Sequence, residues 1–226
     1  MRKILSFFLI FFFCINALAG EPYFCTKAGR KLYYERYSTG ARKLVQTTDF
    51  EIDSLVVGKD GSRRIYYGVT MKKNGKKPIF GGRADLLATV SANGDTRMDI
   101  GTTVLSFIKN LFPRTKATVM GNEGLLPANM KPDDVLPDAN CKISMGLVSV
   151  TIDVTERKVL RMERLHTPAG DFDCIVVRER KKEDAPLHHL DNYLENWYVP
   201  NLGYVRHDVY DENMVLEQTE VLVRIQ

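Results

Sequence analysis

Cysteine is scarce in this sequence, and glycine and proline are no more frequent than in ordinary globular proteins. Its 226 residues include 4 Cys, 16 Gly and 9 Pro. A Cys content this low excludes a small disulfide-rich scaffold, and the Gly and Pro contents exclude a collagen-like or low-complexity disordered chain. The chain also has little excess of charge of either sign, because 28 Asp and Glu residues nearly balance 32 Lys and Arg residues. The composition therefore predicts an ordinary globular protein.

Recognised catalytic motifs are absent as well. The chain contains no GxSxG, P-loop, GxGxxG or HExxH pattern and no CxxC pair. Each of these patterns holds a nucleophile, phosphate, dinucleotide or metal in a defined geometry. A nucleophile can still be assembled from residues that are far apart in sequence, so the absence argues against an enzyme without excluding one. We expect no cofactor and name no catalytic residue.

The first 19 residues have the pattern of a cleaved secretory signal. Arg2 and Lys3 form a short positive start, residues 4–18 are almost entirely apolar, and small residues end the segment at Ala19. The apolar run is shorter than the ~20 residues that span a bilayer. We therefore predict cleavage near Ala19, export to the periplasm or beyond, no transmembrane segment afterwards, and one antiparallel β domain over residues 20–226.

Cys14 raises the alternative of a lipoprotein, because a Cys that follows an apolar run can be acylated. That processing requires small residues just before the Cys, and Phe12 and Phe13 stand there. We therefore do not expect lipid attachment at Cys14.

Three cysteines, Cys25, Cys141 and Cys174, follow the predicted cleavage site. Disulfides persist in an oxidising compartment, and an odd number of cysteines allows at most one internal bridge. We expect one structural disulfide and one buried free Cys. The sequence leaves the pairing open.

Strand signals recur throughout the chain as apolar residues at every second position. In residues 44–57 the apolar side of this alternation comprises Leu44, Phe50, Ile52 and Val56. In residues 63–72 it comprises Ile65, Tyr67, Val69 and Met71. Asn74-Gly75 then predicts a tight hairpin, because both residues tolerate a positive φ.

The second half of the chain alternates in the same way. We expect strands over residues 146–154, 159–165, 172–180, 197–199, 204–210 and 215–225. A charged turn is predicted at residues 156–158, and a hairpin turn at residues 167–171 because Pro168 and Gly170 favour one. A helix that ends at Pro113 is indicated by the helical spacing of Leu105, Ile108, Leu111 and Phe112, and residues 121–139 are expected to form a loop.

These elements predict a mainly β fold with minor α structure. Its simplest form is a single curved antiparallel sheet, or a half-open β-barrel, with one or two short helices packed against it.

Two features would suggest other functions but have simpler explanations. His188 and His189 lie next to Asp191, but a metal site needs three or four converging ligands, so we predict an exposed loop and no metal.

Short basic runs occur at residues 63–64, 72–77 and 180–182. We predict that these runs are solvated strand ends that deter edge pairing, and we expect no nucleic-acid partner.

Aromatic residues concentrate in the expected strands. They are Tyr23, Phe24, Tyr33, Tyr34, Tyr37, Tyr66, Tyr67, Tyr193, Trp197, Tyr198, Tyr204 and Tyr210. On the concave face of an open sheet, such rings could line an apolar pocket. We favour the simpler interpretation, in which the rings fill the core, because aromatic residues are enriched in strands generally.

Three segments have distinctive sequences, which are residues 123–139 (EGLLPANMKPDDVLPDA), 167–174 (TPAGDFDC) and 197–205 (WYVPNLGYV). In this order they resemble a bacterial family of exported domains of unknown function, the TapB-like or DUF3108-like family. Tyr33 and Tyr37 fit the opening Y-x-x-Y strand of that family more loosely. Asp133 stands where the family often has Gly, and Asp171 replaces a Thr. The resemblance implies a curved antiparallel sheet similar to periplasmic lipoprotein carriers, and it implies no activity or catalytic residue.

Together these observations lead to three functional hypotheses. The leading one is non-enzymatic binding of a lipid or other apolar or amphipathic ligand, or of an envelope protein, on the concave face of the sheet, with its contact residues unknown. The alternative is a structural or interaction module of the cell envelope. An enzyme that uses Cys174 or His188 comes third.

Overall fold

The computed structural model describes residues 20–186 and 188–226, whose strands form one antiparallel sheet of 13 strands. Across the sheet the order is β6-β8-β9-β10-β11-β12-β13-β1-β2-β3-β4-β5-β7. The first strand therefore pairs with the last, and β6 and β7 form the two edges. The mainly β fold class is confirmed, and the sheet does not close into a barrel.

The strands and the helix have the following bounds. They are β1 (Lys31–Ser38), β2 (Lys43–Val57), β3 (Arg63–Lys73), β4 (Lys77–Val90), β5 (Thr96–Met98), α1 (Ile100–Leu111), β6 (Thr118–Gly121), β7 (Gly124–Leu126), β8 (Ala139–Met145), β9 (Val148–Thr167), β10 (Gly170–Ala185), β11 (His188–Val199), β12 (Gly203–Tyr210) and β13 (Leu216–Ile225).

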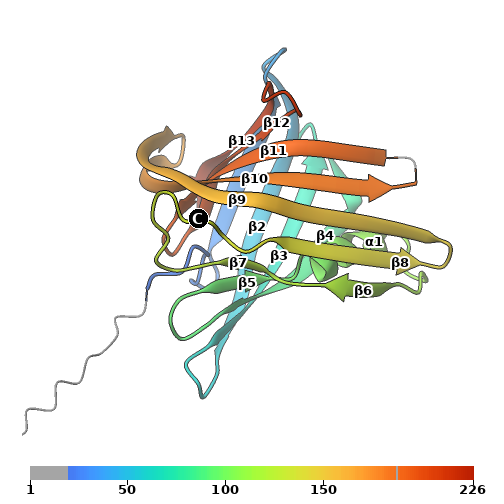
Figure 1. Cartoon of the computed structure of the whole chain (residues 1–226), viewed down its shortest axis with the longest axis horizontal. Coiled ribbons are helices and arrows are strands. Elements are labelled where there is room, and N and C mark those ends of the chain that lie inside the picture. Colours follow the sequence, from blue (N-terminus) through green and yellow to red (C-terminus); the bar gives the residue numbers. More distant parts are fainter. Residues whose placement is uncertain (1–19, 187) are drawn as a thin grey trace, which may run out of the picture.

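The sheet is strongly coiled, so that strands β8–β11 cross in front of strands β2–β4 in Figure 1. Helix α1 contacts β4 on one side and β6 and β8 on the other. It therefore lies between the two ends of the open sheet. Of the described residues, no helix is both long and apolar enough to cross a membrane.

The predicted helix is confirmed, and its start has a clear cause. The Asp99 side chain accepts a hydrogen bond of 3.0 Å from the backbone N–H of Thr102, which satisfies one of the free donors of the first turn. The helix ends at Leu111, two residues before Pro113. Its apolar side packs on a cluster from β8 and β9 that includes Ile143 and Ile152.

The apolar alternation predicted in β3 is confirmed, because Ile65, Tyr67 and Val69 are all buried. The alternation predicted in β2 is wrong at the C-terminal end of the strand, where the predicted apolar position Val56 is exposed. A β-bulge between Ile52 and Ser54 shifts the register by one residue, so Ile52 is buried whereas Val56 is 41% exposed. An extra residue in one strand moves every later side chain to the opposite face.

The charged turn predicted at residues 156–158 is wrong too. Strand β9 continues through these residues, and Glu156 adopts a positive φ of 52° where the pairing with β10 shifts register. This bulge is what places the Arg157 side chain inside the protein, where it is 4% exposed. The predicted loop at residues 121–139 contains the short strand β7.

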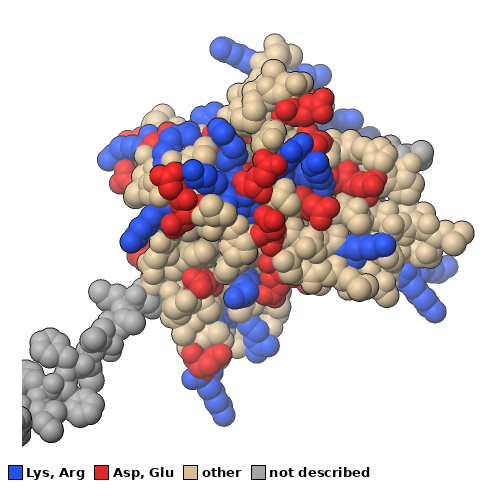
Figure 2. All heavy atoms as spheres, viewed as in Figure 1, with Lys and Arg blue, Asp and Glu red and all other residues tan. Residues whose placement is uncertain are grey.

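The basic run at residues 180–182 lies within strand β10, and the prediction that it marks a strand end is wrong. Arg180 donates to both carboxylate oxygens of Asp191 on β11, at 2.8 and 2.9 Å. Figure 2 shows positive and negative side chains interspersed over the visible face. The long paired strands carry their own counter-charges on this face.

The prediction of one disulfide is wrong for the described residues, among which no disulfide is formed. Cys25, Cys141 and Cys174 are all buried, and all three are free thiols. Cys25 and Cys174 pack in the largest apolar cluster, whereas Cys141 packs in the cluster beneath α1. Each thiol therefore acts as a small apolar core residue.

We predict that all three thiols stay reduced even when residues 20–226 are isolated from an oxidising compartment. Burial raises the pKa of Cys174 to about 12 and also raises that of Cys141, so at pH 8 these two form little reactive thiolate. Cys25 is only 1% exposed, so reagents reach its thiol poorly. Titration with Ellman's reagent should give slow reaction in the native protein and three thiols after unfolding without reductant. Fewer than three thiols after unfolding would reveal a disulfide and contradict this assignment.

Candidate ligand-binding cavity

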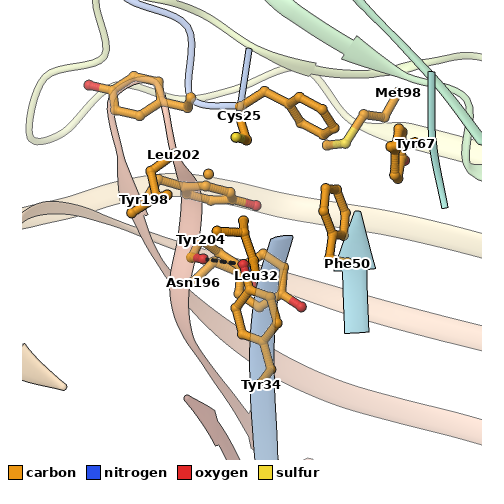
Figure 3. A pocket seen from close by; sticks show the side chains of 13 residues that line it. Cys25, Leu32, Tyr34, Phe50, Tyr67, Met98, Asn196, Tyr198, Leu202 and Tyr204 are labelled. Atoms are coloured by element: carbon orange, nitrogen blue, oxygen red, sulfur yellow. Dashed lines mark hydrogen bonds between the residues drawn. The ribbon is translucent and has the colours of Figure 1, made fainter. Parts of the chain in front are cut away.

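An apolar cavity of about 220 Å³ lies where the N-terminal segment crosses the concave face of the sheet. Its walls come from residues 23–25, from strands β1, β2, β3, β5, β11 and β12, and from the turn between β11 and β12. In Figure 3, Phe50, Tyr67 and Met98 lie on one side of the cavity, and Tyr198, Leu202 and Tyr204 lie on the other. The lining is completed by Tyr23, Phe24, Cys25, Leu32, Tyr34, Asn196 and Gly203.

The aromatic walls hold each other in place. The rings of Tyr34 and Tyr204 are stacked with centroids 4.6 Å apart, and those of Phe50 and Tyr67 are stacked at the same separation. Tyr34 also donates a hydrogen bond of 3.0 Å from its hydroxyl to the backbone oxygen of Tyr204. Both roles considered for the aromatic residues are therefore observed. The rings pack in the core, and they also leave a space between them.

The lining residues carry no formal charge. Burial raises the pKa values of Tyr23, Tyr67 and Tyr198, and it raises those of Tyr34 and Tyr204 still further above their usual range. The tyrosine hydroxyls therefore stay protonated at any physiological pH. The cavity is an apolar space with a few neutral hydrogen-bonding groups in its wall.

Asn196 is the one amide side chain in the lining, and a row of buried and half-buried polar groups fixes it from behind. Arg157 on β9 donates from Nε to Glu179 Oε2 on β10 at 3.1 Å. Asn196 donates from Nδ2 to Glu179 Oε1 at 3.3 Å. His207 on β12 lies 2.7 Å from Asn196, measured between Nδ1 and Oδ1.

The chemistry of Glu179 determines the orientation of each group in this row. An ionised carboxylate only accepts hydrogen bonds, so the Asn196 amide must present its nitrogen to Glu179 and its oxygen to His207. The imidazole must then carry its proton on Nδ1, because the amide oxygen is an acceptor. The buried ion pair thus sets both the amide orientation and the histidine tautomer.

The same row continues across β13 and β1. Asn196, His207, Glu220 and Arg36 lie opposite one another on the successive strands β11, β12, β13 and β1. Glu220 is 2% exposed and accepts 2.7 Å hydrogen bonds from Arg36 Nη2 and Thr48 Oγ1. Because these residues are far apart in sequence, no local sequence motif predicts the row. The one available signal is that a polar residue falls on the inward phase of each strand.

The residues singled out from sequence as other candidates do not gather into a site. His188 and His189 are exposed at the start of β11, within the strand, whereas a loop was predicted. Across residues 20–186 and 188–226, no three His, Cys, Asp or Glu side chains are grouped to hold a metal ion. Cys174 is buried in the core, with its thiol donating to the Phe172 backbone oxygen at 3.6 Å.

Comparison with known sequences places the chain in a family. The family model described as DUF3108-like matches residues 27–222, which is nearly all of the described chain. The chain belongs to the DUF3108-like family. The resemblance found in the three sequence segments is therefore confirmed. No curated protein matches the sequence significantly.

Two solved structures share the fold of this DUF3108-like protein. One, from Bacteroides fragilis, is described as an exported protein with a YmcC-like fold. It is 23% identical, with a TM-score of 0.73, and the match covers 91% of this chain and 99% of that chain. The other, from Parabacteroides distasonis, is described as a lipoprotein. It is 21% identical, with a TM-score of 0.73, and the match covers 92% and 99% of the two chains.

The description of the Parabacteroides protein bears on the lipid prediction. It gives no support to our expectation that Cys14 escapes acylation. The predicted signal sequence, including Cys14 and the cleavage site after Ala19, lies outside the described residues.

We predict that Arg157→Met lowers the free energy of unfolding of the DUF3108-like chain by about 3–5 kcal/mol, because it leaves Glu179, whose side chain is only 13% exposed, without its cation. The substitution also removes the donors to the backbone oxygens of Leu125 and Pro137. The matched control is Arg164→Met, whose side chain is 71% exposed and whose loss should change stability by about 0.5 kcal/mol or less. Urea unfolding measures both. Equal effects would contradict the role assigned to Arg157.

We also predict a pH dependence that comes from His207. Burial is the main factor that lowers the pKa of this imidazole to about 4, with a contribution from the charge of Arg36. In the unfolded chain the imidazole takes up a proton near its ordinary pKa of about 6.5. The unfolded state therefore binds more protons between pH 4 and 6.5, and stability that is fully present above pH 6.5 is lost as the pH falls toward 4.

This loss should amount to at most about 3 kcal/mol, and His207→Gln should remove it. Urea unfolding at pH 4.5 and pH 7 gives the difference for each protein. The control His188→Gln changes an exposed imidazole and should keep the wild-type dependence. A wild-type dependence retained in His207→Gln would show that other groups cause it.

Proposed function

We propose that this protein is exported and binds an apolar or amphipathic small molecule in the cavity beneath its N-terminal segment. The observation that carries the proposal is a cavity of about 220 Å³ that aromatic and aliphatic side chains surround but do not fill. Protein interiors are close-packed, so an apolar space of this size costs stability and calls for an explanation. Occupation by a ligand would supply the missing contacts.

The size of the cavity limits the ligand. An apolar cavity of about 150 Å³ is large enough to take up benzene, whereas pockets for drug-sized ligands exceed about 300 Å³. The space here falls between these values, so it suits a single ring with small substituents or a short segment of an acyl chain. A whole lipid would have to leave most of its length outside.

Export is proposed from the sequence pattern of residues 1–19, which combines a positive start, an apolar run and a small residue at Ala19. The segment that follows supports this arrangement. The Gly20 backbone N–H donates to the Asn93 backbone oxygen at 3.0 Å, and Asn201 N–H donates to the Pro22 oxygen at 2.7 Å. A chain cleaved after Ala19 would begin with a segment already held against the fold.

The alternative function is an interaction module of the cell envelope. It is favoured by apolar side chains at the end of α1, where Leu111 is 47% exposed and Phe112 is 60% exposed. Such a module would act through its surface, and blocking the cavity would leave its function intact.

We predict that Leu202→Trp blocks the cavity and weakens binding of the neutral one-ring probe toluene at least about tenfold. Leu202 lines the cavity and is 6% exposed, so a larger side chain there occupies the space that the probe needs. Isothermal titration calorimetry of the probe with residues 20–226 measures this affinity.

Leu190→Trp is the matched control, because Leu190 is 38% exposed on β11 and is not part of the lining. This variant should bind the probe like the wild type, and circular dichroism should show that both variants are folded. Probe binding that persists unchanged in folded Leu202→Trp, or wild-type protein that binds no probe, would refute the proposed function.

A further inference from the structure

We propose that the cavity selects ligands without net charge, and that Asn196 recognises their polar group. This inference rests on the proposed function, because it assigns the chemistry of the molecule that the cavity takes up. In this proposal Asn196 determines specificity, and the aromatic walls contact the apolar part of the ligand.

The first observation is that the lining offers a charged group no counter-ion. The faces of its aromatic rings attract a cation, but by less than the cost of removing the water from that cation. Its residues are aromatic, aliphatic or neutral polar, and none is an Asp, Glu, Lys or Arg. A carboxylate or ammonium that enters such a space loses its water and gains no counter-ion, which is among the costliest changes a binding site can impose. A phosphate or carboxylate headgroup would therefore have to remain outside.

The charges behind the wall do not change this conclusion. Glu179 is held by Arg157, and Glu220 is held by Arg36 and Thr48. These carboxylates lie close enough to raise the pKa values of the lining hydroxyls of Tyr198 and Tyr204, although burial is the larger cause. Each is already paired, so neither is free to bind a cation.

The second observation is the bonding of Asn196, whose side chain is 5% exposed and lines the cavity. Its amide has two N–H donors and two oxygen lone pairs. Within the described part of the chain, its side-chain partners are Glu179 and His207. One donor and one lone pair are therefore left for a ligand, on a group whose orientation is already fixed.

A group oriented before binding loses little entropy when a ligand arrives. The free donor and lone pair suit a neutral hydroxyl or carbonyl. A ligand without such a group would still bind by contact with the rings, but it would leave the amide unpaired. Removing the amide should therefore affect polar ligands and spare purely apolar ones.

The test uses four one-ring molecules of similar size with residues 20–226 at pH 7. Toluene is apolar, p-cresol adds a neutral hydroxyl, p-toluate is an anion and benzylammonium is a cation. Isothermal titration calorimetry measures their affinities. We expect toluene and p-cresol to bind, and both ions to bind at least about tenfold more weakly than p-cresol.

The second arm compares two asparagine substitutions on β11. Asn196→Leu should lower the affinity for p-cresol relative to toluene about tenfold, because it removes the hydrogen-bonding partner. Asn192→Leu, which lies on the same strand outside the lining, should leave that ratio unchanged. Asn196→Ser, whose smaller side chain disturbs packing less, should lower the ratio in the same direction if Asn196→Leu does not fold.

The outcomes separate this inference from the proposed function. If none of the four molecules binds the wild type, the proposed function fails. If toluene and p-cresol bind but an ion binds as tightly as p-cresol, charge selection is wrong. If the ratio is unchanged in the folded Asn196 variants, the role of Asn196 is wrong and the cavity remains a binding site.

Discussion

The buried ion pair between Arg157 and Glu179 joins three parts of the molecule. Arg157 reaches the inside because a bulge at Glu156 turns it there, and it binds the backbone oxygens of Leu125 and Pro137 in the segment that crosses between the two halves of the sheet. Glu179, in turn, orients Asn196 at the cavity wall. A single desolvated pair thus positions the crossing segment and the polar group of the cavity at the same time.

A row of polar groups away from water stabilises the fold less than its number of contacts suggests, because each group loses its hydration. Packed apolar residues would often be as stable as an ion pair or more so. Here the row leaves one amide of fixed orientation facing an otherwise apolar space, which an apolar wall cannot provide. The loss of stability is then explained by the recognition of a ligand group, while the stacked pairs Tyr34–Tyr204 and Phe50–Tyr67 hold the walls of the space apart.

The sequence was sufficient to predict the fold class, the alternation of β3, the helix before Pro113 and the family resemblance, because these depend on local patterns. It was misleading at Val56 and at Arg157, where one extra residue reverses the faces of a strand. The row of polar groups lay beyond prediction for a different reason. Asn196, His207, Glu220 and Arg36 meet only because β11, β12, β13 and β1 are neighbours in the sheet, and that order places the last strand beside the first.

The most direct test of the account is a crystal structure of residues 20–226 with p-bromophenol, whose bromine can be located by anomalous scattering. The account predicts a single strong bromine peak inside the cavity, with the phenol oxygen within hydrogen-bonding distance of the Asn196 amide. An empty cavity at saturating p-bromophenol, or a phenol bound there with its oxygen turned away from Asn196, would contradict it.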